Sequence, residues 1–381
     1  MVAACPLPAP RGTPVRIHRL ADALSRCGHS VHVVAYHLGE PGPPPFYQLH
    51  RAARVPSYRK MSPGPSVQKL LVLDPLLTIR LCRLLRQERF DVIHAHHFEG
   101  LLVALAARRR GTPIVFDAHT LLESELPYYV PGPLRGGFRS MGGLLDRMLP
   151  ARADHVIAVS QPIRDRLLAN RICPADRISI VESGVTWEHF QRAARVAADP
   201  HAAELIYTGN LAAFQGIDLM LRAFATVARC RPQVRLRIVT DSSFAPYEGL
   251  ARELGVRERL DVHPAAFSEI PDWMAGAQVA LNPRIHCDGL PQKLMNYMAA
   301  GKAIVSFAGS ARGLVDGQNA LVVPDGDIDA FALAIQRFLD DGDLATRLGQ
   351  SAHQSIRGGT WELAAEKTEA VYRRVLEAAS G

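Results

Sequence analysis

Short, continuously apolar segments alternate with amphipathic stretches along almost the whole chain, and this alternation limits the fold more than any other feature. Val31–Tyr36 and Pro113–Asp117 are two of the apolar segments, and Val15–Cys27 is one of the amphipathic stretches. Strands that are apolar on both faces and separated by helices are typical of a parallel sheet covered on both sides. The sequence therefore predicts a doubly wound α/β architecture with parallel sheets.

The alternation lapses once and then restarts, which indicates two domains. Residues 190–203 are polar and Ala-rich, and Glu204–Thr208 opens a second series of apolar segments. A chain of 381 residues is also longer than one ordinary core supports. We expect Rossmann-like domains at 1–188 and 189–360, with a C-terminal helix within 361–381 joining the first domain. The Pro-rich, aperiodic segment 39–65 is predicted to be a long loop.

Cysteine usage and the lack of targeting signals bear on the compartment. The six cysteines are scattered, with no CxxC pair and no Cys/His cluster, which favours buried thiols in a reducing compartment over a disulfide frame or a zinc site. The start of the chain does not resemble a signal peptide, and no uncharged apolar run reaches about 18 residues. We expect a cytoplasmic protein. Because Met1 falls near the end of the first expected strand, an upstream in-frame start is an alternative.

Charge is distributed unevenly along the chain. The net charge is +7; residues 1–190 carry 24 Lys and Arg against 15 Asp and Glu, and the rest carry 20 against 22. A basic first half indicates attraction to an anionic partner, either a membrane surface or an acidic acceptor, with solubility alone as the alternative. The basic segment 131–152 is the candidate for peripheral contact with the inner face of a membrane, and a solvated helix is its alternative. No basic helix is interleaved with aromatic residues, so nucleic acid is not an expected partner.

Two motifs in the first half are candidates for a ligand site. Gly12 precedes Thr13 and Pro14, which are a good N-cap and first helical residue, and a helix start behind a glycine turn can bind phosphate. His119 lies just past the carboxyl end of the strand Pro113–Asp117, where such folds bind ligands. A plain turn and a structural histidine are the respective alternatives.

Two loops in the second half are the corresponding candidates. The loop 209–218 joins a strand to a helix and directs backbone amides to the carboxyl edge of the sheet, unless it is only a connection. The segment 288–301 again opens a helix behind a glycine turn, and a capped helix is the alternative reading. At that edge we expect several residues whose side chains or backbone could contact a ligand: Asp288, Gly289, Leu290, Pro291, Lys293 and Asn296.

The order and spacing of these segments resemble glycosyltransferase family 4. The resemblance runs from RGTPVRIHRLADALSRCGHSVHVVAYHLG through FDAHTLLESELPYY and YTGNLAAFQGIDLML to DGLPQKLMNYMAAGKAIVSFAGSARGL. It implies a GT-B fold, with two Rossmann-like domains facing across a cleft. It also implies a retaining, metal-independent transfer of a sugar from a nucleotide sugar to a saccharide, lipid or other small acceptor. No cofactor beyond the donor substrate is implied.

The resemblance also implies roles for individual residues. His119 and Asp288 would be the catalytic residues at the transferred sugar, and Asn296 would bind the nucleotide ribose. Asp288 and Asn296 fall on the two acidic positions of the family's E-x7-E pattern. The donor phosphates would be bound by Gly12, Asn210, Gln215, Gly289, Leu290, Pro291 and Lys293.

The chain departs from the family pattern where charge matters most. Both acidic positions are altered, giving Asp-x7-Asn, and Asn210 and Gln215 replace the usual pair of cations. Because a diphosphate leaving group gains negative charge in the transition state, Lys293, Arg284 and helix amides would have to compensate. A non-catalytic GT-B protein that binds a nucleotide sugar or a partner protein is therefore one alternative. A sugar-nucleotide 2-epimerase is another.

Overall fold

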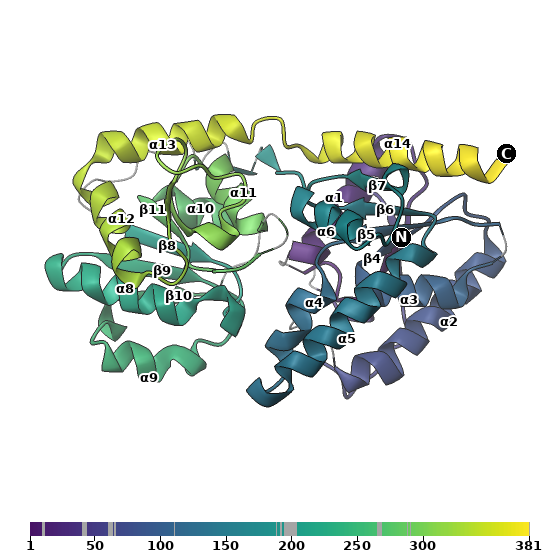
Figure 1. The fold of residues 1–381 in the computed structure, drawn as a ribbon, viewed down its shortest axis with the longest axis horizontal. Helices are drawn as coiled ribbons and strands as arrows, with labels where there is room; N and C mark the ends of the chain where they lie inside the picture. The colour runs from purple at the N-terminus through teal and green to yellow at the C-terminus, as the bar shows by residue number, and fades with distance from the viewer. Residues whose placement is uncertain are drawn as a thin grey trace. The chain divides into compact units, whose positions relative to one another are not determined.

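In the computed structural model the chain forms two compact units, each built on one parallel sheet (Figure 1). The first unit comprises Met1–Gly184 and Trp361–Gly381, and the second comprises Val185–Thr360. The structure describes residues 1–9, 12–39, 44–59, 64, 66–109, 111–187, 189–190, 193, 204–264, 269–287, 289 and 291–380. Most of the expected linker at 190–203 lies outside these residues.

The first sheet has seven parallel strands in the order β3-β2-β1-β4-β5-β6-β7, so the direction of winding reverses between β1 and β4. Side chains that alternate along β2 face opposite layers: Val33 packs with Ile17 of α1, and Val34 packs with Leu77 of α2. The strands are β1 (Val2–Ala3), β2 (His32–Ala35), β3 (Gln48–Arg51), β4 (Ile93–His96), β5 (Ile114–Ala118), β6 (His155–Ala158) and β7 (Ile178–Ile180).

Helices cover both faces of this sheet, and the C-terminal helix α14 packs along α1. The longer helices are α1 (Gly12–Arg26), α2 (Asp74–Gln87), α3 (His97–Ala107), α5 (Arg135–Met148), α6 (Gln161–Ala169) and α14 (Trp361–Ser380). Short turns of helix complete the unit: η1 (Lys69–Leu73), α4 (Leu122–Glu125), η2 (Leu126–Tyr129), η3 (Gly132–Leu134), η4 (Pro150–Arg152) and η5 (Ala175–Arg177).

The prediction of a loop throughout 39–65 is wrong at Gln48–Arg51, which forms β3. This strand pairs with β2 alone and lies at the edge of the sheet, partly exposed. An edge strand needs no continuous apolar run, and Leu49 is the one aliphatic residue of its four. Arg51 helps to fix the neighbouring chain by donating to the backbone carbonyls of Tyr36, Leu38 and Leu7. Residues 40–43, 60–63 and 65 of the same segment lie outside the described part of the chain.

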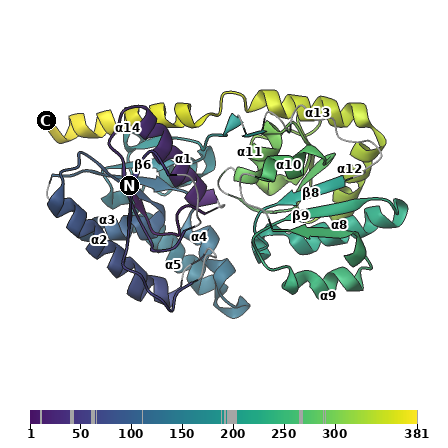
Figure 2. The ribbon, with the colours of Figure 1, turned by 180° about the vertical axis from the view of Figure 1, so that it is seen from behind.

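The second sheet has six parallel strands in the order β10-β9-β8-β11-β12-β13 and reverses between β8 and β11. Helices α8 and α12 pack on one face, and α10 and α11 on the other (Figure 2). The strands are β8 (Glu204–Thr208), β9 (Arg235–Val239), β10 (Leu260–His263), β11 (Val279–Asn282), β12 (Ala303–Phe307) and β13 (Leu321–Val323). The helices are η6 (Ala213–Gln215), α8 (Ile217–Cys230), α9 (Ala245–Glu253), η7 (Arg257–Arg259), α10 (Ile270–Ala275), α11 (Gln292–Ala299), η9 (Ala308–Ser310), α12 (Ile328–Asp340) and α13 (Gly342–Ser355).

The predicted fold class, two doubly wound parallel α/β sheets, is confirmed. In each unit, the connections that follow the two strands at the reversal run in opposite directions. The space between the carboxyl ends of these two strands is where sheets of this kind bind ligands. No helix in the described ranges is both long and apolar enough to cross a lipid bilayer.

Candidate functional site

In the second unit, the loops after β8 and β11 and the start of α11 are held together around one lysine. Lys293 Nζ donates to Gln215 Oε1 at 2.7 Å and to the Tyr207 hydroxyl at 3.3 Å, and it lies 4.4 Å from the centre of the Tyr207 ring. Burial, with a smaller contribution from Arg284, lowers the pKa of Lys293 well below its ordinary value. The ammonium group is therefore poised to gain from any anion that binds beside it.

Arg284 lies next to the same loop. Its guanidinium stacks over the Phe214 ring at 4.8 Å, and its Nε donates to the His286 carbonyl at 2.6 Å. The backbone just before it touches Gly216, whose φ is +71°, so that a Cβ there would lie 2.1 Å from the Pro283 carbonyl oxygen. Glycine at 216 therefore allows η6 and the loop after β11 to meet.

The other described candidates of this unit lie in the loop after β8 and around the start of α11. Asn210 Oδ1 accepts from the Ala212 amide at 3.1 Å, which shapes the loop in the manner of an Asx turn. Pro291 is the N-cap residue of α11, and its side chain accepts no hydrogen bond from the first turn of that helix. Asn296 is buried, and its Oδ1 accepts from Gln292 at 3.4 Å. Gly289 is half-buried, and Asp288 and Leu290 lie outside the described residues.

In the first unit, a buried ion pair organises the carboxyl edge of the sheet. Arg16 donates through Nε and Nη2 to both oxygens of Asp117, at 3.0 and 3.2 Å, and it also reaches the Val181 carbonyl and the Ser183 hydroxyl. Burial alone would raise the pKa of Asp117, but Arg16 and the neighbouring imidazoles hold it well below its usual value. Asp117 is thus a carboxylate acceptor at neutral pH.

His119 joins this network at its outer side. Its Nε2 lies 3.3 Å from His96 Nδ1 and 3.9 Å from Asp117 Oδ2. Burial lowers the pKa of His119 well below its ordinary value, so the ring is neutral and can hydrogen-bond a hydroxyl group. Gly12 is the first residue of α1, the helix that carries Arg16, and a Cβ on it would meet nothing within 4 Å. The described structure leaves open space beside Gly12, as a phosphate contact there requires.

His94, His96 and Asp117 also place three potential metal-ligand atoms within 4.8 Å of one another. The residues present fit a hydrogen-bond network better than a metal. Arg16 already occupies both oxygens of Asp117, and the Tyr372 hydroxyl lies 2.7 Å from His94 Nδ1. A dication would have to lie beside a buried guanidinium with a single carboxylate to balance both.

Sequence reasoning missed a second polar cluster at the end of β4. His97 has a φ of +61°, which is uncommon for a side chain with a Cβ, and its ring lies between two carboxylates. Its Nδ1 is 2.5 Å from Glu99 and its Nε2 is 3.4 Å from Glu125. Burial opposes the charge, but the two carboxylates raise the pKa of His97 to about 10. The only available signal was the run His96-His97-Phe98-Glu99 at the end of a strand.

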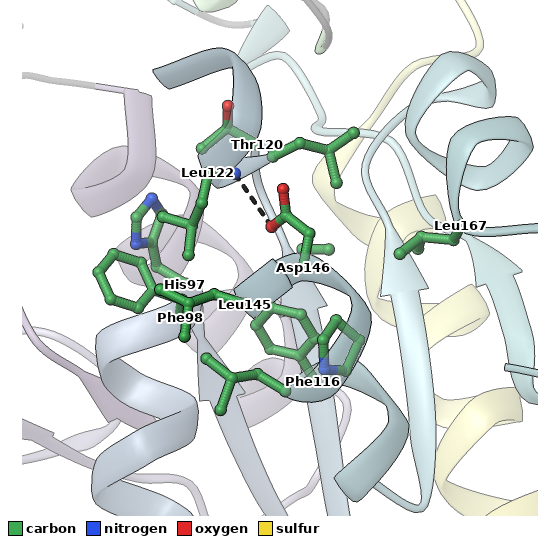
Figure 3. A pocket seen from close by; sticks show the side chains of 12 residues that line it. His97, Phe98, Phe116, Thr120, Leu122, Leu145, Asp146 and Leu167 are labelled. Carbon is green, nitrogen blue, oxygen red and sulfur yellow. Dashed lines mark hydrogen bonds between the residues drawn. The ribbon is translucent and has the colours of Figure 1, made fainter. Parts of the chain in front are cut away.

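A small recess, partly open to solvent, adjoins His97 (Figure 3). Figure 3 shows Phe98, Leu122 and Leu145 turned toward it and Asp146 bonded to the backbone of Leu122. The wall is mainly apolar, so the first unit combines charged hydrogen-bonding groups with an apolar surface at one edge of its sheet.

Two Rossmann-like units, each with polar groups where its sheet reverses, define a protein of the GT-B class. The model for Glycosyltransferase Family 4 matches residues 10–188, and the model for Glycosyl transferases group 1 matches residues 202–341. These two matches confirm the resemblance to glycosyltransferase family 4 noted in the sequence.

Individual relatives agree with this assignment. The chain is 26% identical over 310 residues to a D-inositol 3-phosphate glycosyltransferase of Streptomyces avermitilis, covering 76% of this chain but only 66% of that protein. A protein of the same name from Thermobispora bispora is 27% identical over 374 residues, or 88% and 83% of the two chains.

Two solved structures share the fold over nearly their whole length. Sucrose-phosphate synthase from Thermosynechococcus elongatus has a TM-score of 0.81 at 19% identity, with 99% of each chain covered. Anabaena HepE in complex with UDP and glucose has a TM-score of 0.73 at 16% identity, covering 98% of this chain and 99% of that one.

Substitution of Gly216 by alanine tests the contact between the two loops of the second unit. We expect Gly216→Ala to lower the free energy of unfolding by about 2–4 kcal/mol, because it adds a clash with Pro283 to the strain of a left-handed backbone. Gly255→Ala is the matched control, since Gly255 has a φ of +69° and a Cβ there would meet nothing within 4 Å. Urea unfolding measures both; equal losses would show that the Gly216–Pro283 contact does not constrain the loop.

Proposed function

We propose that the protein is a retaining, metal-independent glycosyltransferase that moves a sugar from a nucleotide sugar to a saccharide, lipid-linked or other small acceptor. The observation that carries the proposal is the 2.7 Å contact between Lys293 Nζ and Gln215 Oε1. Gln215 stands where the family resemblance predicts a cation. Lys293 reaches that position from α11, and its amine would supply the positive charge when a phosphate binds beside it.

The electrostatics of leaving-group departure explain why this contact matters. A nucleoside diphosphate gains charge as the sugar leaves, and preorganised donors that face that charge lower the barrier. Lys293 and Arg284 both adjoin the loop after β8, and the first amides of α11 add partial positive charge. We assign the donor phosphates to these groups together with Gly12, Asn210, Gly289, Leu290 and Pro291, and the ribose to Asn296.

The chemistry at the sugar follows from the remaining groups. His119 is neutral and would bind a hydroxyl of the transferred sugar or of the acceptor, and Asp288 would hold hydroxyls of the transferred sugar. We propose front-face displacement: the bond from the anomeric carbon to the phosphate oxygen breaks, the acceptor oxygen bonds to the same face, and the leaving phosphate takes the acceptor's proton. No cofactor beyond the donor enters this reaction. Among solved relatives, Anabaena HepE is described in complex with UDP-glucose, which supports a nucleotide-sugar donor.

A second candidate is a non-catalytic protein that binds a nucleotide sugar. The neutral side chains at Asn210 and Gln215 favour it, because binding demands less charge compensation than departure of a diphosphate. Release of nucleoside diphosphate from a nucleotide sugar by the purified protein separates the two candidates. The donor for that assay is first identified by thermal shift with UDP, GDP, ADP and their sugars, since a ligand of the native state raises its stability.

A charge transposition tests the role of Lys293. We expect Lys293→Gln to weaken nucleoside diphosphate binding about thirtyfold, the equivalent of losing about 2 kcal/mol from a charged hydrogen bond. The double variant Gln215→Lys/Lys293→Gln returns a cation to the other partner of the same contact, so it should recover much of that loss. Titration calorimetry gives the affinities, and release of diphosphate from the nucleotide sugar gives the rates. If the single variant binds and turns over like the unaltered protein, the phosphate assignment is wrong.

The lowered pKa of Lys293 predicts a pH dependence of donor binding. In the free protein, burial shifts Lys293 toward its neutral form; a bound phosphate would favour the ammonium form and raise the pKa. Binding should therefore take up a proton between the lowered and the raised pKa, and affinity should fall as pH rises through that window. Calorimetry in buffers of different ionisation enthalpy measures the uptake. Lys293→Met corrects for titration of the ligand itself, and equal uptake by both proteins would contradict the prediction.

A further inference from the structure

Helix α5 has unusually little of its surface buried. Gly142 is the one buried residue among its fourteen, while Leu144 is 55% exposed and Met141 and Met148 are exposed to a similar extent. Helices of folded proteins normally bury their apolar stripe. Leu145 packs against the core of the first unit, but Met141, Leu144 and Met148 leave much of their apolar surface exposed.

The attachment of α5 leaves its outer surface basic. A Cβ on Gly142 would lie 2.6 Å from the backbone of Leu122, so the helix is held against α4 at a close approach. Asp146, the single acidic residue of α5, turns toward α4 and accepts from the Leu122 and Glu123 amides at 3.0 and 2.9 Å (Figure 3). The exposed charges of α5 are therefore arginines alone: Arg135, Arg139 and Arg147.

A second exposed apolar element starts just before η1 and continues into it. Val67, Leu70 and Leu71 are 72%, 57% and 66% exposed. The charged residues among them face inward: Lys69 Nζ donates to the Gly64 carbonyl, and Asp74 accepts from the Tyr36 hydroxyl. This π-helical turn therefore presents aliphatic side chains outward, while the charged groups of Lys69 and Asp74 are bonded on its inner side.

The two elements belong to one surface. A Cβ on Gly64, the carbonyl partner of Lys69, would lie 2.4 Å from the Tyr129 ring, and Tyr129 belongs to η2, which packs on α5. Both ribbon views show α5 and the start of α2 at the same end of the first unit (Figures 1 and 2). We call residues 67–72 and 128–148 together the basic–apolar surface.

We propose that the basic–apolar surface docks on an anionic lipid bilayer. Exposed leucines and methionines enter the boundary between headgroups and acyl chains, and arginines beside them bind lipid phosphates. The inward turn of Asp146 removes the one α5 carboxylate that an anionic surface would repel. Sequence patterning alone indicates only residues 131–152 for this contact; the structure adds η1 and explains why Asp146 does not oppose it.

Flotation of the full chain with vesicles tests the proposal. We expect the protein to float with vesicles of phosphatidylcholine and phosphatidylglycerol, less at high salt, and poorly with phosphatidylcholine alone. Arg135→Gln/Arg139→Gln should weaken partitioning about 25-fold, which corresponds to about 1 kcal/mol for each basic residue. Leu70→Ser/Leu71→Ser and Leu144→Ser/Met148→Ser should each reduce it as well, because both elements insert.

Matched variants of exposed residues in the second unit control for general effects. Leu333→Ser/Val315→Ser and Arg222→Gln/Arg347→Gln should float like the unaltered protein. The proposal is overturned if the unaltered protein stays unbound, or if these controls lose as much binding as the α5 and η1 variants. It is also overturned if sedimentation shows a dimer that Leu144→Ser/Met148→Ser dissociates, because a second copy then covers the surface. Diphosphate release without vesicles, measured on the same variants, reports sugar transfer separately.

Discussion

The ion pair between Arg16 and Asp117 connects the elements that position the polar side chains at the carboxyl edge of the first sheet. One guanidinium links α1 to β5 and to the chain at residues 181–183, and His94 extends the network to Tyr372 of α14. A buried pair of this kind contributes less to stability than to a defined arrangement, since loss of one partner leaves a charge without compensation. Burial is the largest cause of the lowered pKa of His119; Asp117 opposes this shift and Arg16 adds to it.

In the second unit, the electrostatic requirement is to balance the charge of an expected diphosphate with few cationic side chains. Its loop after β8 lacks the cations that the family pattern predicts, yet Lys293 reaches back from α11 to Gln215 and Arg284 stacks on Phe214 of the same loop. A lysine with a lowered pKa costs the free protein less than a buried full charge would, and a phosphate bound beside it would favour the charged form again. Replacement of loop cations by Asn210 and Gln215 is therefore compatible with sugar transfer.

Sequence patterns predicted the two sheets because fully buried strands such as Ile114–Ala118 require continuous apolar runs. They failed at Gln48–Arg51, where an edge strand has one neighbour and needs no such run. For the site, residue type and position indicated Lys293 and His119, but not their partners. Gln215 is 78 residues from Lys293, and the placement of His97 between Glu99 and Glu125 depends on a positive φ that no local pattern signals. Contacts of that kind exist only once the chain is folded.

Asp146 connects the exposed surface of the first unit with its polar edge. By capping the amides of Leu122 and Glu123 it fixes the start of α4, the short helix that ends at Glu125, whose carboxylate lies against His97. The same bonds remove an acidic group from the outer side of α5. Since α5 buries little else, its position depends on this cap and on the close approach at Gly142. Consecutive contacts therefore join α5 to the His97 cluster at the end of β4: Asp146 to the start of α4, and Glu125 to His97.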